Sequence, residues 1–294
     1  MTATPNNLLQ ADEALGKLRI ALDEGRVDDA IALGREAVAA APRYLRAIAG
    51  LAAALRTAGD DAEARRVLDA VPANVLASPK ELVAIAEICL NQGVEGTAKE
   101  MLRTALEAEP TRAVTAELLA RLLFSEGDVA GVVAVCEPFR LRGKATPTLL
   151  RMLAAAYEQF GDLATAAERA QAYAQAAYLD PHAHYHLATL EHRRGDVREA
   201  MRRYQLALTL SGADDELAGA ASDGVRALDA LQLRQVTALA AQDPAFRLNL
   251  SRDLRETLDE RGFALSDEGL AVLATMDIEA LIRSGMGRQG HGYH

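Results

Sequence analysis

Large aromatic side chains are scarce in this sequence. It has no tryptophan, and phenylalanine and tyrosine together make up only 4% of its 294 residues, although 50% of the residues are hydrophobic. The interior must therefore be filled mainly by alanine, leucine and valine. Such small side chains allow helices to pack closely, and this composition favours a helical protein that does not depend on one large core.

Cysteine, long apolar runs and an excess of positive charge are also missing. The two cysteines, Cys89 and Cys136, do not support a disulfide framework; they are predicted to be buried small hydrophobic residues, which fits a cytoplasmic location. The net charge of −10 argues against nucleic-acid binding. No apolar run reaches the roughly 18 residues that suggest a membrane span. The N-terminal segment lacks the basic and apolar stretches of a signal peptide.

Six glycines recur at a spacing of 34 residues. They are Gly25, Gly59, Gly93, Gly127, Gly161 and Gly195. Glycine suits the left-handed backbone conformation that ends many helices. An aspartate follows four of these glycines and can cap the next helix by accepting a backbone N–H bond. The spacing therefore predicts six helical hairpins, each turning at its glycine.

A slim residue stands five positions after each of these glycines. The six residues are Ala30, Ala64, Ala98, Val132, Ala166 and Ala200. A side chain of this size allows the two helices of a hairpin to approach closely. Prolines at positions 42, 110 and 181 are predicted to turn the chain from one hairpin into the next, because proline cannot continue a helix.

These residues resemble the tetratricopeptide repeat, a helix–turn–helix unit with a 34-residue period. The resemblance covers residues 11–210 and implies an all-α, right-handed superhelical solenoid. It also implies a non-enzymatic scaffold or adaptor without a cofactor, which binds a protein or peptide in a concave groove. The fourth repeat departs most from the pattern, with Val132 at the slim position and Pro138 expected to interrupt its second helix.

Two segments flank the expected repeats. Residues 1–10 are polar and are expected to be disordered. After residue 210 the periodic glycine is replaced by Asp229, and residues 211–242 are predicted to form a capping helix or a helix pair broken near Gly224. A repeat array needs such a cap to cover its end.

The C-terminal part is predicted to be a small helical module followed by a tail. Within residues 243–284 we expect one helix ending at Arg261, a second helix with Ser266 as its N-cap, and a last short helix from residue 278. Residues 285–294 are glycine-rich and are expected to be flexible.

The segment from Asp243 to Leu281 resembles the small helical module of certain bacterial ribosomal-peptide precursors, those with nitrile-hydratase-like leaders. It is also similar to the small helical domain of ring-opening extradiol dioxygenases. The shared features are the DPAFR start, the Gly-Phe turn at Gly262 and the LSDE helix start at Leu265. A proline usual in the first helix of these modules is absent. The alternative interpretation is a helical extension of the solenoid.

The first helices of the hairpins would line the groove, and the 34-residue phase selects their inward positions. The candidate binding residues are Arg19, Arg46, Arg56, Lys80, Asn91, Arg121, Arg151, Tyr185, His192 and Arg193. Basic residues predominate, although Glu87, Glu117 and Glu158 fall on the same face. This lining would suit an acidic peptide, because arginine binds carboxylates through two parallel hydrogen bonds. The alternative interpretation is an ordinary solvated face.

Histidines cluster in the first helix of the sixth repeat, and two of them, His182 and His186, are one helical turn apart. They could share a metal ion, although no third ligand lies suitably placed in the sequence. No catalytic motif is recognisable, since the glycines are hairpin turns rather than a phosphate-binding loop.

Two further hypotheses remain beside the scaffold. The chain could be a carrier or precursor-like protein, whose module docks an enzyme that modifies His291, Tyr293 or His294 in the tail. It could also be a metal protein or enzyme built around His182, His186 and His192. Self-association into a homo-oligomer and a role as an accessory subunit are compatible with the repeat array.

Overall fold

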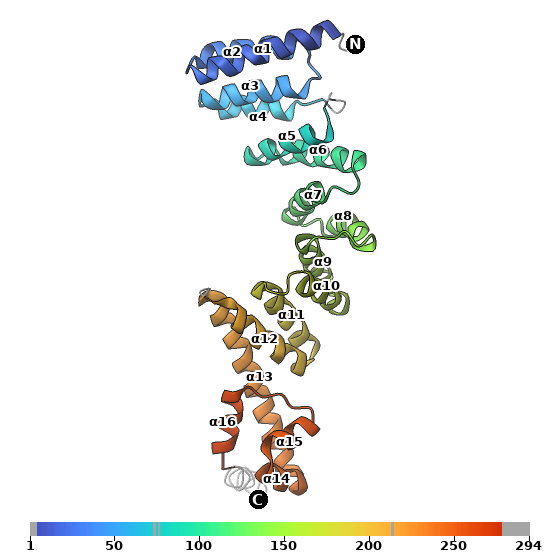
Figure 1. The fold of residues 1–294 in the computed structure, drawn as a ribbon, viewed down its shortest axis with the longest axis vertical. Coiled ribbons are helices and arrows are strands. Elements are labelled where there is room, and N and C mark those ends of the chain that lie inside the picture. The colour runs from blue at the N-terminus through green and yellow to red at the C-terminus, as the bar shows by residue number, and fades with distance from the viewer. Residues whose placement is uncertain (1–4, 73–74, 76, 213–214, 278–294) are drawn as a thin grey trace, which may run out of the picture. The chain divides into compact units, whose positions relative to one another are not determined.

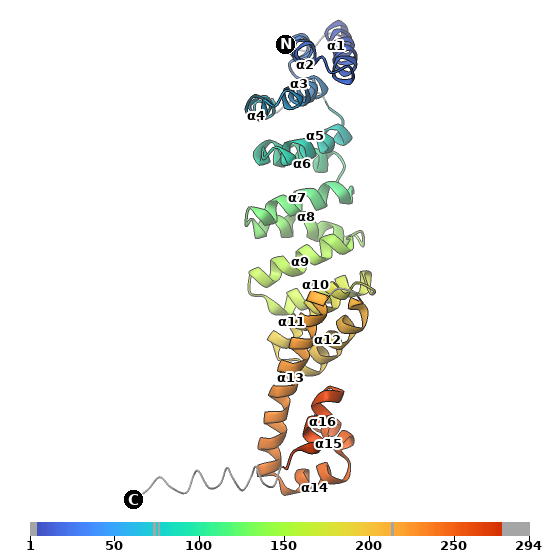
Figure 2. The same cartoon turned by 90° about the vertical axis from the view of Figure 1, so that its left-hand side faces the viewer.

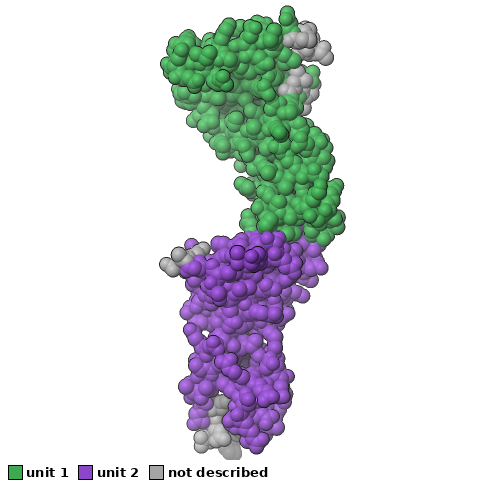
Figure 3. All heavy atoms as spheres, viewed as in Figure 1, with its two compact units in different colours: residues 1–152 green, residues 153–294 purple. Residues whose placement is uncertain are grey.

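The computed structural model describes residues 5–72, 75, 77–212 and 215–277. Within these residues every regular element is a helix, and there are 16 of them. The chain divides into two compact units, residues 1–152 and 153–294, which are described in turn (Figure 3). The expected all-α helical-repeat fold is confirmed. None of the described helices is both long and apolar enough to span a bilayer.

Unit 1 is a stack of helical hairpins. Its helices are α1 (Pro5–Asp23), α2 (Val27–Ala40), α3 (Leu45–Thr57), α4 (Asp61–Asp69), α5 (Pro79–Asn91), α6 (Glu95–Ala108), α7 (Ala113–Ser125) and α8 (Val129–Leu141). Consecutive helices pair as antiparallel hairpins, as Figures 1 and 2 show from two sides. Helix α9 (Pro147–Gln159) contains the division between the units.

Unit 2 continues the repeats and adds the C-terminal module. Its further helices are α10 (Leu163–Ala176), α11 (Pro181–Arg194), α12 (Val197–Ser211), α13 (Asp215–Gln242), α14 (Pro244–Arg252), α15 (Leu254–Glu260) and α16 (Asp267–Thr275). Helices α11 and α12 pair closely, and α13 packs along α12. After the long helix α13 the chain forms α14, α15 and α16, which lie along the second half of α13 (Figure 2).

The hairpin turns form as the sequence predicts. All six periodic glycines have positive φ, between 71° and 85°. The aspartates at positions 60, 128, 162 and 196 each accept a hydrogen bond from a backbone N–H three residues later, which caps the second helix of the hairpin. All six slim residues are fully buried, so they lie where the helices approach each other.

Several predicted helix boundaries are wrong. Helix α1 begins at Pro5, so residues 5–10 are helical rather than disordered. Helix α8 runs through Pro138 to Leu141 without interruption. Helix α13 is continuous, with no break at Gly224, where a larger residue would clash with the ring of Tyr204.

The single helix expected between residues 243 and 261 is two helices, α14 and α15. The chain leaves the helical conformation at Asp253, whose side chain accepts a hydrogen bond from the Glu256 N–H and so caps α15. The predicted cap of α16 is confirmed, because the Ser266 hydroxyl accepts from the Gly269 N–H at 3.0 Å. The expected helix at residues 278–284 lies outside the described residues.

Helix α13 is shared between two hydrophobic cores. Its first half contributes Ala221, Val225 and Leu228 to a core with α11 and α12. Its second half contributes Val236 and Ala240 to a core with α14, α15 and α16. The core of the C-terminal module therefore includes residues that precede the boundary predicted at residue 243.

Candidate functional site

The ten candidate binding residues all lie on first helices of the hairpins, as their phase predicts. Seven belong to unit 1 and three, Tyr185, His192 and Arg193, belong to α11 in unit 2. The seven residues of unit 1 are exposed, whereas Tyr185 and His192 are half-buried.

Neighbouring first helices of unit 1 are joined by an ion pair between Arg46 on α3 and Glu81 on α5. Glu81 also accepts hydrogen bonds from the Ser78 N–H at 2.7 Å and the Ser78 hydroxyl at 2.8 Å, which completes a capping box at the start of α5. The bonds from Ser78, and then the Arg46 guanidinium, lower the pKa of Glu81. Arg46 is therefore already occupied by a carboxylate of its own chain, which the sequence analysis did not foresee.

Two arginines farther along unit 1 remain open. Arg121 on α7 and Arg151 at the start of α9 are exposed, and no other described residue forms an ion pair or hydrogen bond with either side chain. Val114 lies two helical turns before Arg121 on the same face of α7, and it is 55% exposed. Glu117, between them on this face, accepts a hydrogen bond from the Thr146 hydroxyl. This face, defined by Val114, Arg121 and Arg151, is called the α7–α9 surface below.

In unit 2 the corresponding face is occupied by contacts within the chain. Glu158 on α9 pairs with Arg193 and lies 3.2 Å from the His186 Nε2, both on α11. The rings of Tyr185 and His192 lie 5.8 Å and 6.4 Å from the ring of Tyr204. Three of the candidates, Tyr185, His192 and Arg193, therefore have structural partners in their own unit.

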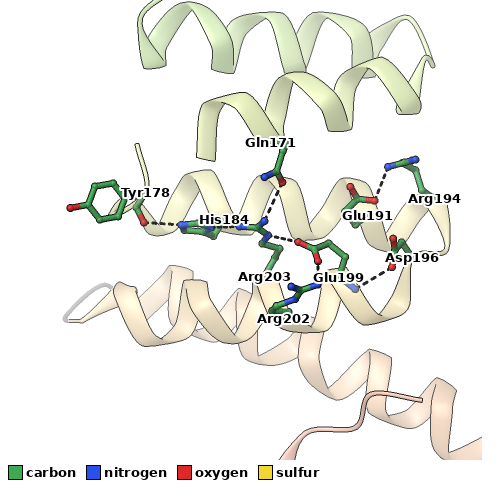
Figure 4. Close-up of polar contacts among 9 residues, drawn as sticks. All are labelled: Gln171, Tyr178, His184, Glu191, Arg194, Asp196, Glu199, Arg202 and Arg203. Carbon is green, nitrogen blue, oxygen red and sulfur yellow. Dashed lines mark hydrogen bonds and ion pairs between the residues drawn. The ribbon is translucent and has the colours of Figure 1, made fainter. Parts of the chain in front are cut away.

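A polar network that the sequence analysis missed holds the sixth hairpin together (Figure 4). Arg203 on α12 is at its centre. It donates to Glu199 at 2.6 Å and to Gln171 on α10 at 3.1 Å, and it lies 3.4 Å from the Nδ1 of His184 on α11. The Nε2 of His184 lies 2.8 Å from the Tyr178 carbonyl oxygen. A carbonyl only accepts, so Nε2 carries the proton and Nδ1 accepts from Arg203.

The network gives His184 a structural role. His184 is buried, and its two nitrogens join the loop before α11 to α12. Two turns further along α11, Glu191 is buried and pairs with Arg194 at 2.8 Å. Burial raises the pKa of Glu191, which Arg194 opposes. Within the described part of the chain no three His, Cys, Asp or Glu side chains gather as metal ligands. The contacts of Arg203 with His184 and Gln171 join residues 19 and 32 positions apart, so the sequence carries no local signal for them.

Both cysteines are fully buried and unpaired. Burial raises the pKa of the Cys89 thiol to about 11. Burial, together with the nearby Glu137 and Glu117, raises the pKa of the Cys136 thiol to about 12. The predicted tail residues His291, Tyr293 and His294 lie outside the described residues.

Residues 21–80 match the family model of the tetratricopeptide repeat. No curated protein sequence matches the chain. Among solved structures, the chain is similar to the C-terminal part of a TPR repeat-containing protein from Cytophaga hutchinsonii. The two are 13% identical, with a TM-score of 0.52 over 83% of this chain and 98% of that chain.

The chain is also similar to two further solved structures. In a structure of Naa15/Naa10 bound to HypK-THB, the matched chain shares 16% sequence identity with this chain. The TM-score is 0.51, and the match covers 96% of this chain but only 42% of that chain. MamA 41-end from Desulfovibrio magneticus RS-1 is 18% identical with a TM-score of 0.46, over 58% of this chain and 97% of that chain. The chain is thus a helical-repeat protein with the tetratricopeptide fold.

Proposed function

We propose that this tetratricopeptide-type array is a non-catalytic scaffold that binds an acidic segment of a partner protein on the α7–α9 surface. The observation that carries the proposal is the pair of open arginines. On the first helices, Arg46 and Arg193 are neutralised by Glu81 and Glu158. Arg19, Arg56, Arg121 and Arg151 have no such partner among the described residues, and the last two share the α7–α9 surface with the exposed Val114.

The chemistry of this surface fits an extended peptide that carries carboxylates beside an aliphatic side chain. A guanidinium binds a carboxylate through two parallel hydrogen bonds, and the exposed Val114 offers an apolar contact. The face is formed by helices that are already folded, so the repeat array itself loses little conformational entropy when the partner binds. Electrostatic attraction should also make the association sensitive to salt.

Charge reversal on this surface tests the proposal. We expect the double variant Arg121→Glu/Arg151→Glu to lose, by at least about tenfold, the partner that the wild-type protein captures from cells of its source. The matched control is Arg35→Glu, an exposed arginine on the second helix α2, which should capture the partner normally. Equal capture by the double variant and the wild type would exclude the α7–α9 surface as the binding site.

A second candidate function is that of a carrier whose C-terminal tail is modified by an enzyme that docks on the module. It is supported by the hydrophobic core that α14, α15 and α16 form with the second half of α13, which makes the module a recognisable element beside the repeats. Intact-mass measurement of protein from its source would show a mass shift within residues 285–294. An unmodified tail in cells that contain the docking enzyme would exclude this candidate.

A further inference from the structure

The C-terminal module has an open groove between α14 and the end of α16. The groove has a volume of about 670 Å³, and its apolar lining is Leu248, Leu250, Leu254, Leu273 and Met276. Leu250 and Leu273 belong to the hydrophobic core of the module, whereas the side chain of Leu248 is 52% exposed. This cavity is called the module groove below. Its apolar wall is therefore only partly covered by the described residues.

The described part of the chain ends at the edge of this groove. Helix α16 ends at Thr275, and Met276 has an extended backbone with ψ of 127°, so the chain changes direction instead of prolonging α16. Met276 and Asp277, the last described residue, both line the module groove. Residue 278 is bonded to Asp277, and the next segment of the chain therefore begins at the groove itself.

The sequence of that next segment has an apolar pattern. Residues 278–284 read IEALIRS, in which Ile278, Leu281 and Ile282 have the spacing that places three side chains on one face of a helix. Aspartate is a favoured residue at the N-cap, so Asp277 suits the start of such a helix. The segment attached to the groove thus has an apolar face of the kind that the groove could cover.

We propose that residues 278–284 of this chain dock as a short helix in the module groove, with Leu281 against Leu248. The choice of occupant follows from the covalent attachment. A segment joined to the groove by a single peptide bond has an effective concentration on the order of millimolar or more. A free peptide or a second copy of the chain competes with it only above such a concentration.

Docking would extend the core of the module and fix the point from which residues 285–294 leave it. The inference does not rest on the proposed peptide-binding function. The module groove lies in unit 2 and the α7–α9 surface is formed by residues of unit 1, so the two share no side chain.

Disulfide trapping in the full chain tests the pairing of Leu281 with Leu248. The variant Leu248→Cys/Leu281→Cys should form an intramolecular disulfide on mild oxidation, because such a bond needs Cα atoms within about 7 Å. Cys89 and Cys136 are fully buried, so neither competes for the new thiols. Intact mass and reduced or non-reduced gel mobility measure the bond.

The matched control is Val272→Cys/Leu281→Cys. Val272 is 46% exposed on α16, but it does not line the groove. It is closer to Leu281 in the chain than Leu248 is, so an undocked segment would reach position 272 at least as readily. We expect the control to form its disulfide at least tenfold more slowly. Equal rates, or a bond between two copies of the chain, would overturn the proposal.

Hydrogen exchange tests the docking without new cysteines. The variant Leu281→Asp/Ile282→Asp places charges on the proposed apolar face, and the α14 amides should then exchange at least tenfold faster than in the wild type. The control Met286→Asp changes an apolar residue just beyond the segment and should leave the α14 amides as they are. Circular dichroism checks that the repeats remain helical. Unchanged exchange in the double variant would show that residues 278–284 do not occupy the groove.

Discussion

At the scale of single residues, the hairpins depend on glycines held in a left-handed backbone conformation. Gly127 has φ of 76°, and the turn it makes brings Asp128 into position to cap α8. A Cβ atom at Gly127 would meet no neighbouring atom within 4 Å. The requirement for glycine at this position is therefore one of backbone conformation and not of space.

Gly127→Ala should consequently lower the free energy of unfolding by about 1–2 kcal/mol, the cost of a left-handed alanine. Gly219→Ala is the matched control, because Gly219 lies inside α13 without a positive φ and also has open space around it. That change should stabilise the protein by about 0.5–1 kcal/mol, since alanine favours the helix. Urea denaturation measures both, and equal effects of the two changes would contradict this account of the turn.

The buried thiols predict a dependence of stability on alkaline pH. Burial raises the pKa of Cys89 to about 11, so the folded protein keeps a proton that the unfolded chain begins to release near pH 9.0. Cys136 behaves in the same way. The unfolded state binds fewer protons in this range, so the stability that the neutral thiols contribute is lost as pH rises from about 9 towards 11.

The variant Cys89→Ala/Cys136→Ala should show a flatter decrease of unfolding free energy across that range than the wild type. The difference between the two curves isolates the thiols from the buried tyrosines. Parallel curves would mean that the thiols are accessible to hydroxide in the folded state.

Local interactions could be predicted at this scale, whereas distant ones could not. The caps at Asp128 and Ser266 follow from residues within one turn, and the structure confirms both. The pair of Glu158 with Arg193 joins residues 35 positions apart on different helices. Whether such residues meet depends on the distance between the two helices and on the length of the side chains. The 34-residue spacing gives neither of these.

At the scale of elements, α13 joins the repeats to the C-terminal module. Asp229 stands where the next periodic glycine would be, so the helix continues instead of turning. Its buried carboxylate accepts from the Ser266 N–H at 2.9 Å and from the Ser266 hydroxyl. One turn later, Gln232 bonds both the N–H and the carbonyl of Ala264, at 2.7 Å and 2.9 Å. These bonds attach the start of α16 to α13.

Asp229→Ala should therefore loosen the module, because it leaves the buried Ser266 N–H without an acceptor. We expect the opening free energy of the α16 amides to fall by about 1–3 kcal/mol, as measured by hydrogen exchange. The control Asp223→Ala lies on the same helix but removes an exposed side chain paired with Arg226, and should change little. Unchanged exchange in α16 after Asp229→Ala would show that the apolar core alone docks the module.

At this scale the order of helices could be predicted from the sequence, but the contribution of α13 to two hydrophobic cores could not. The failure of the glycine period at Asp229 indicated the end of the repeats. That α13 serves two cores depends on which apolar residues face α12 and which face α14 to α16, and a single amphipathic pattern fits either arrangement.

At the scale of the whole molecule, the described hairpins of each unit provide extended helical faces. Several charged residues on the first helices pair within the chain, as Arg46, Glu81 and Glu158 show. The α7–α9 surface combines two open arginines with the exposed apolar side chain of Val114. We therefore propose the α7–α9 surface as the part of the first-helix face that binds a partner.

Photo-crosslinking tests this placement most directly. A photoreactive amino acid replaces Val114 on α7 in one protein and Leu141 on α8 in another, both exposed in the free chain. The account predicts that the partner retained by the wild-type protein is crosslinked from position 114 and not from position 141. Crosslinking from position 141 alone, or from neither position while the partner remains bound, would contradict it.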